Sequence, residues 1–151
     1  MNIYTITGSD TLTIWGRTFV DFADGDNSTI VFQNDLVKIK TGKNKNTIFS
    51  RDESGNNCEV TLRILRGSAD DRFLQGKLSQ ILGDFPSTEL GEGQLVKRLG
   101  DGLGNVISDV VTLQGGVIAR NVDTKDNSEG DYTQGISIYK IFFASGKRSI
   151  Q

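Results

Sequence analysis

The sequence contains no histidine among its 151 residues and only one cysteine, Cys58. Without histidine the chain lacks the most common metal ligand, and nucleophiles that depend on a neighbouring imidazole are excluded. A single cysteine forms neither an intrachain disulfide nor a thiolate zinc site, and it is compatible with a reducing compartment. Because Cys58 stands among alternating apolar residues, we expect it to be a small core residue. These absences argue against an enzyme, and we expect no cofactor and no small-molecule substrate.

The sequence also lacks a strong net charge and a long apolar stretch. Its 17 basic and 19 acidic residues give a net charge of −2, unlike the basic surface of a nucleic-acid-binding protein. The longest apolar run, residues 141–144, is far shorter than the roughly 20 residues of a membrane-spanning helix. The first residues show neither the basic nor the apolar region of a secretory signal. We therefore expect synthesis in the cytoplasm and no membrane partner.

Glycine, aspartate and asparagine recur about every ten residues, whereas proline occurs once. This spacing is typical of short strands joined by tight turns. The clearest strand covers 58–66, where apolar and polar residues alternate as in an antiparallel strand with one buried face. The residues after 146 are expected to form a loose polar tail. Other strands are predicted at 3–7, 11–15, 18–22, 28–32, 36–40, 94–99, 106–113, 116–121 and 132–144, with hairpin turns at 100–105 and 114–116.

Residues 68–84 change to helical spacing. Ser68 can accept a hydrogen bond at the start of a helix, and Asp71 follows at the position of a capping box. Asp70 and Asp71 would lie in the first turn, where the helix dipole favours negative charge. Gly83 and the proline after it end the pattern. The predicted fold is mainly β, an antiparallel β-sandwich or rolled sheet in a single domain (1–151), with this one flanking helix.

A long polar segment at 41–57 interrupts the strands. Loops of this length within a compact domain are usually functional, and 47–51 can form a short strand within a protruding loop or hairpin. Apolar residues in such a projection favour contact with another protein. The candidate contact residues are Lys43, Lys45, Ile48, Phe49, Arg51, Asp52 and Glu53.

Other motifs have simpler interpretations. The glycines of 100–104 resemble a phosphate cradle, but strand patterns on both sides favour a hairpin turn. The run 24–27 lacks the ligand ladder of a calcium loop and reads as a turn. Trp15 can stack on a sugar or a partner, or pack half-buried.

The order of several short motifs along the chain resembles the tail tube protein of contractile-tailed bacteriophages. This family is often described only as phage structural protein, and it is related to type VI secretion and pyocin tubes. The resemblance covers nearly the whole chain, and no catalytic motif belongs to it. It is carried by TGSDTLTI at 7–14, FADGD at 22–26, NDLVKIKTGKN at 34–44, LRILRGSADD at 62–71, VKRLGDG at 96–102 and GGV at 115–117.

The resemblance implies a structural role in the virion tail. Six copies would form a ring whose sheets join into a barrel, and stacked rings would form a hollow tube. DNA would pass through the lumen without specific binding, and the sheath, baseplate and terminator proteins would be partners. Segment 41–57 would be the stacking element, with Ile48 and Phe49 as apolar anchors and the charged residues setting the register.

Three alternatives remain open from the sequence. The chain can be a related ring protein of the tail, such as a terminator or a baseplate component. It can instead be a β-sandwich carbohydrate-binding module, with Trp15 and Tyr132 as stacking residues. A small hydrolase with paired carboxylates is a third alternative, although no histidine or cleft motif supports it.

Overall fold

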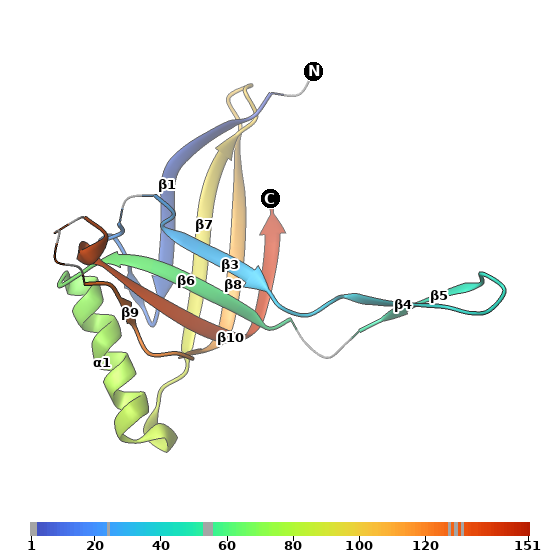
Figure 1. Ribbon diagram of the computed structural model, residues 1–151. Coiled ribbons are helices and arrows are strands. Elements are labelled where there is room, and N and C mark those ends of the chain that lie inside the picture. The colour runs from blue at the N-terminus through green and yellow to red at the C-terminus, as the bar shows by residue number, and fades with distance from the viewer. Residues whose placement is uncertain (1–2, 24, 53–55, 127, 129, 131) are drawn as a thin grey trace.

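The computed structural model describes residues 3–23, 25–52, 56–126, 128, 130 and 132–151. Ten strands, one α-helix and two short 3-10 turns make up the described elements (Figure 1). The helix α1 covers Ala69–Gly83, and the turns η1 and η2 cover Phe85–Ser87 and Tyr132–Gly135. The strands are β1 (Thr5–Ile14), β2 (Arg17–Thr18), β3 (Ser28–Phe32), β4 (Val37–Thr41), β5 (Thr47–Arg51), β6 (Cys58–Leu65), β7 (Gly91–Gly100), β8 (Val106–Ile118), β9 (Asp123–Thr124) and β10 (Ile136–Ile150).

Eight of these strands form one antiparallel sheet in the order β2-β1-β7-β8-β10-β6-β3, with β9 added beside β10. The sheet rolls because β10 changes neighbours along its length. Its first part, from Ile136 to Phe143, pairs with β6, whereas its second part, from Ile141 to Ile150, pairs with β8. The β6 and β3 layer therefore crosses in front of the β1, β7 and β8 layer (Figure 1). The expected rolled, mainly β architecture with one helix is confirmed.

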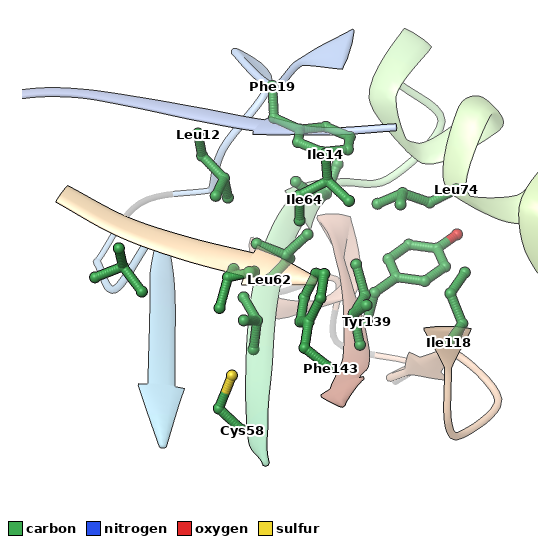
Figure 2. Close-up of a cluster of buried hydrophobic side chains, with 14 of the residues drawn as sticks. Leu12, Ile14, Phe19, Cys58, Leu62, Ile64, Leu74, Ile118, Tyr139 and Phe143 are labelled. Atoms are coloured by element: carbon green, nitrogen blue, oxygen red, sulfur yellow. The ribbon is translucent and has the colours of Figure 1, made fainter. Parts of the chain in front are cut away.

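The core fills the space inside the roll. The alternating residues of β6 that point inward, from Cys58 to Ile64, are completely buried, as the sequence pattern predicts. They meet inward residues of β1, β8 and β10, and Figure 2 shows these side chains converging. Burial raises the pKa of the Cys58 thiol, which agrees with a core role for this residue. The other fully enclosed apolar side chains include Leu12, Ile14, Phe19, Leu113, Tyr139, Ile141 and Phe143.

Helix α1 is held to the sheet by its first turn. Ser68 caps the helix as predicted, its side chain accepting a hydrogen bond from the amide of Asp71. Asp70 is fully buried and accepts a 2.8 Å hydrogen bond from Arg17 Nε. The amides of Val20 and Asp21 donate to its other oxygen at 2.8 and 2.9 Å. Asp70 is therefore a tertiary anchor, beyond the role in the helix dipole that the sequence assigns to it.

The predicted strand at 18–22 is wrong beyond Thr18. Arg17–Thr18 pair with β1, and Phe22 forms an isolated bridge with Ile64 of β6. Between them the strand is interrupted, because the amides of Val20 and Asp21 bond to Asp70. The two short strands expected at 3–7 and 11–15 are one strand, β1, whose pairing with β7 shifts register between Ile6 and Asp10.

The hairpin turn predicted at 114–116 is also wrong, since β8 runs straight through it. Gly115 has a φ of +69°, and it lies where the pairing of β8 with β7 shifts register. A Cβ at Gly116 would lie 2.3 Å from the ring of Phe143, so this glycine allows the ring to lie against the strand. The C-terminal residues are not a loose tail, because β10 pairs with β8 as far as Ile150 and Gln151 bonds with Ser108.

The buried phenol of Tyr139 gives a first test of the helix attachment. Its hydroxyl donates to the side chain of Asp71, and burial and this carboxylate together raise the pKa of the phenol, which stays a donor. Tyr139→Phe should lower the free energy of unfolding by about 1–2 kcal/mol, because Asp71 loses a partner in a partly buried site. Urea denaturation measures the change, and the exposed Tyr4→Phe is the control. Equal midpoints for both variants would contradict this role.

Candidate assembly interface

The most prominent surface feature is an arm formed by β4 and β5, defined here as residues 36–52. These two strands pair only with each other and stand away from the rolled sheet (Figure 1). Every side chain from Val31 to Arg51 is exposed. The protruding hairpin predicted at 41–57 is present, but the expected strand at 36–40 belongs to it. The arm, at 36–52, therefore begins earlier in the chain than the segment 41–57 that the sequence pattern indicates.

Few contacts within the chain hold the arm. Its ends are joined by a 2.8 Å hydrogen bond from the amide of Asp52 to the carbonyl of Leu36. Lys38 and Asp52 form an ion pair at 3.4 Å, and the hydroxyls of Thr41 and Thr47 lie 3.3 Å apart. An isolated two-stranded ribbon is only marginally stable in water. A surface of this kind is typical of a segment that is completed by a partner.

Cross-strand pairing divides the arm into two faces of different character. Ile39 lies opposite Phe49, and Val37 lies opposite Arg51, so these side chains share one face. We call Val37, Ile39 and Phe49 the apolar arm face. Lys40 lies opposite Ile48 on the other face, which also carries Lys38. The two predicted anchors, Ile48 and Phe49, therefore point in opposite directions and cannot occupy one pocket.

The structure places the other predicted contact residues at the tip and root of the arm. Lys43 and Lys45 lie in the turn at the tip, where the amide of Gly42 bonds to the carbonyl of Asn46. Lys45 has a φ of +65°, in the left-handed region. Arg51 and Asp52 lie at the root, and Glu53 lies outside the described residues. The sequence identified this segment but missed Val37 and Ile39, because they read as part of a strand in the main sheet.

Charge is distributed unevenly between the arm and the rest of the chain. Residues 36–52 contain five basic side chains and one acidic side chain, whereas the remainder contains 12 basic and 18 acidic side chains. The overall value of −2 therefore conceals a basic arm on an acidic body. Such a charge asymmetry favours contact of the arm with the body of another copy over contact between two arms.

The two faces allow a direct test of which side of the arm is covered in an assembly. Phe49→Ser should weaken self-association more than Ile48→Ser, because Phe49 belongs to a three-residue apolar face and Ile48 lies among lysines. Loss of a buried aromatic anchor costs about 2 kcal/mol or more, which corresponds to roughly a thirtyfold weaker association. Sedimentation velocity over a concentration series measures both variants. A larger effect of Ile48→Ser would show that the basic face makes the contact.

The rolled sheet also leaves strand edges without a partner among the described residues. β3 ends the sheet on one side, and on the other side β2 covers only Thr13 and Ile14 of β1. Val31 and Phe32 on β3 are 52% and 44% exposed. Open edges with exposed apolar residues promote pairing with another chain. They are a second element of the candidate interface, beside the arm.

Two motifs with possible binding roles in the sequence have structural roles instead. The glycines of 100–104 form the turn between β7 and β8, where the side chain of Asp101 accepts hydrogen bonds from the amides of Leu103 and Asn105. Trp15 packs between Gly91 and Lys77, and its indole nitrogen donates to the carbonyl of Glu89. The indole is therefore already engaged, which does not support its use as a sugar-stacking platform. The side chain of Tyr132 is not among those described.

Other site types find little support in the described residues. No group of three or more potential metal ligands occurs there, and no helix is long and apolar enough to cross a membrane. The surface hollows include one of about 490 Å³ at the root of the arm. The arm and the open edges remain the features that most clearly suggest a function.

Neither a protein-family model nor a curated protein matches the sequence. Solved structures do match over almost the whole chain. The first is described as the anti-feeding prophage cap, the AFP tube terminating cap, with a TM-score of 0.64, 9% identity, and coverage of 97% of this chain and 91% of that chain. The second is the PVC sheath/tube terminator of an extracellular contractile injection system in its extended state, with a TM-score of 0.54, 8% identity, and coverage of 95% and 94%.

A third structure comes from the PVC sheath-tube complex in its extended state, with a TM-score of 0.56, 11% identity, and coverage of 94% of this chain and 87% of that chain. The identities are too low to carry a residue's role from these proteins to this chain. These structures agree with the resemblance seen in the sequence in the kind of fold. The fold of this chain is thus one found in tube, terminator and cap assemblies of contractile injection systems.

Proposed function

We propose that this chain is a structural subunit of a contractile tail or injection assembly, and that its copies form the ring that ends the tube. The observation that carries the proposal is the match to the AFP tube terminating cap along 97% of the chain. The similarity to the PVC sheath/tube terminator supports the same role. The resemblance seen in the sequence favours the repeating tube subunit, whereas this proposal favours the ring at the end of the tube.

The features of this chain give the proposed ring a physical basis. Copies arranged in a closed ring, six in our proposal, can pair the open edges of β1 and β3 and so cover exposed backbone groups. The basic arm then reaches from its own subunit to a neighbouring one, and its charge favours an acidic surface there. A wall of mildly acidic subunits repels phosphates, so DNA or another cargo would pass without specific binding.

A second candidate is the repeating tube subunit itself. It is favoured by the match to the PVC sheath-tube complex and by the length of the arm, which suits contact with a neighbouring ring. The two candidates differ in one respect. A ring of repeating subunits must stack on an identical ring at each of its two faces, whereas a terminal ring binds the tube at one face only. In either case the partners are tail components, and the assembled protein is part of the virion or particle.

Negative-stain electron microscopy with light scattering over a concentration series tests the proposal. Single hollow rings with six-fold end views that do not lengthen with concentration are expected for a terminal ring. Hollow tubes that lengthen with concentration would replace it by the tube subunit. Particles that remain monomeric at the highest concentration would contradict both. A glycan screen would then test the carbohydrate-binding alternative.

A further inference from the structure

A groove lies where the arm joins the rolled sheet. It has a volume of about 490 Å³ and is open to the surface. Its apolar part is formed by Phe32 of β3 and Leu36 of the arm, which are 44% and 66% exposed. Gly146, Lys147 and Arg148 of β10 also line it, together with Arg51 of the arm. Its lining, completed by three asparagines, therefore combines apolar, amide and basic side chains, and we call its cations the basic rim.

The cations of this rim are only partly neutralised within the chain. Arg148 forms a 2.7 Å ion pair with Asp109. Neither Arg51 nor Lys147 forms an ion pair with any other residue that the structure describes. No carboxylate appears among the described residues lining the groove. Its occupant should consequently combine apolar side chains with negative charge.

One segment of the same chain has this combination. Residues 82–90, at the end of α1 and in the turn after it, carry three exposed apolar side chains and two exposed carboxylates but no cation. We call this stretch the helix-end segment. The carboxylate of Glu89 makes a long ion pair of 3.8 Å with Lys77. Asp84 engages its own chain through its backbone, because its amide donates to the carbonyl of Gln80 and its carbonyl accepts from Ser87. Leu82, Phe85 and Leu90 are 67%, 64% and 64% exposed.

The two surfaces lie on different sides of the molecule. In Figure 1 the end of α1 projects below the sheet, whereas the root of the arm lies at the opposite flank. The groove of one copy therefore cannot receive its own helix-end segment, but it can receive that of a second copy.

We propose that the helix-end segment of one copy docks in the arm-root groove of the next, with Phe85 inserted among the apolar side chains. This inference rests on the proposed function, because it names the contact that joins neighbouring copies. Asp84 and Glu89 then face the basic rim formed by Arg51 and Lys147. The contact is heterologous, since each copy presents a groove on one side and a segment on the other, and it repeats around a ring. It leaves the arm beyond its root available for other contacts.

Charge reversal tests this contact without disturbing the fold. In Asp84→Lys a cation replaces an exposed acid at the end of a helix, where the dipole favours it. Lys147→Glu changes an exposed side chain on β10. Each single variant should associate about tenfold more weakly than the wild-type chain, because like charges then face each other across the interface. The chain carrying both changes, or an equimolar mixture of the two single variants, should regain association.

Sedimentation velocity measures the association, with the exposed Lys125→Glu as a matched charge reversal outside the groove. Association that persists unchanged in both single variants, or that fails to return in the double variant, overturns this contact alone. A wild-type chain that does not associate at any concentration overturns the proposed function and this contact with it.

Cross-linking supplies an independent measurement of proximity. A mixture of Phe85→Cys and Leu36→Cys chains should form a disulfide-linked pair under mild oxidation, since the native Cys58 is buried and unreactive. In a control mixture, chains with Leu103→Cys take the place of those with Phe85→Cys; Leu103 is 85% exposed on the β7–β8 turn. The yield of disulfide-linked pairs should then be at least tenfold lower. Equal yields from the two mixtures would overturn the proposed contact.

Discussion

Removal of the arm should leave a folded chain that no longer assembles with its partners. The change replaces residues 37–51 by two glycines, which connect Leu36 to Asp52. These two residues already lie together, because the amide of Asp52 donates to the carbonyl of Leu36 at 2.8 Å. No residue from 37 to 51 belongs to the buried core. The melting temperature should therefore change by no more than about 2 °C, whereas stacking onto a tube should fall below detection.

The physical reason is that the arm carries exposed surface without a partner in its own chain. Val37, Ile39 and Phe49 are 49%, 64% and 68% exposed, so their burial is available only to an intermolecular contact. Circular dichroism melts measure the fold, and electron microscopy of mixtures with preformed tubes measures stacking. A smaller excision, residues 43–53, removes only the tip and one return strand and should have the same effect on stacking.

A matched control keeps the arm but removes the two cations at its tip. Replacing Lys43 and Lys45 by glutamine preserves the length of the hairpin, so any stacking that depends on reach alone should survive. We expect a partial loss that is restored at low ionic strength, since exposed charges act mainly through screened, long-range attraction. Normal stacking by the excised chain would show that the arm is dispensable, and the open sheet edges would then be the candidate for that contact.

The parts of the fold that could be predicted are those in which local pattern and tertiary environment agree. Inward and outward residues alternate along β6 without interruption in the sequence. In the sheet the inward ones are buried and the others are more exposed. Helix α1 has its cap residue, its apolar stripe and its terminating glycine within one segment. The arm could be located because its polar composition breaks the strand pattern. The position of its root could not be predicted. Residues 36–40 alternate as in any strand, and sequence does not tell which strand they pair with.

The parts that could not be predicted depend on contacts between distant residues. Gly115 and Gly116 read as a turn, but Gly116 is needed for the ring of Phe143, which lies far away in sequence. The tail after residue 146 is polar, yet backbone pairing with β8 fixes it in the sheet. Ile48 and Phe49 are neighbours in sequence and lie on opposite faces, because the register of β4 and β5 decides which side each occupies.

Replacement of Asp70 by alanine should destabilise the fold more than Tyr139→Phe does. The carboxylate is completely buried and receives hydrogen bonds from Arg17 and from the amides of Val20 and Asp21. Asp70→Ala leaves these donors without their acceptor and separates α1 from the loop after β2. Breaking a buried, hydrogen-bonded charge pair costs about 3 kcal/mol. For a chain of this size that corresponds to a fall in melting temperature of roughly 6–12 °C.

The pH dependence of stability provides a second readout that a purely steric role would not give. Burial opposes ionisation of Asp70, but the amides of Asp21 and Val20 and the guanidinium of Arg17 outweigh it, so its pKa lies below the ordinary value. A carboxyl with a lowered pKa stabilises the fold fully above its unfolded-state pKa of about 4, and this contribution is lost as the pH falls through the folded-state pKa. The wild-type chain should therefore lose more stability between pH 5 and pH 3 than Asp70→Asn does.

Thermal melts of the wild-type chain, Asp70→Ala, Asp70→Asn and the exposed Asp123→Ala measure both effects in one series. Asp123→Ala should melt within about 1 °C of the wild-type chain, because exposed substitutions away from such networks have small effects. The same melts bear on assembly, since α1 carries the helix-end segment and Asp70 fixes the first turn of that helix to the sheet. If Asp70→Ala melted like Asp123→Ala, the packing of Leu74 and Leu78 would be sufficient to hold the helix, and the hydrogen bonds to Asp70 would contribute nothing measurable.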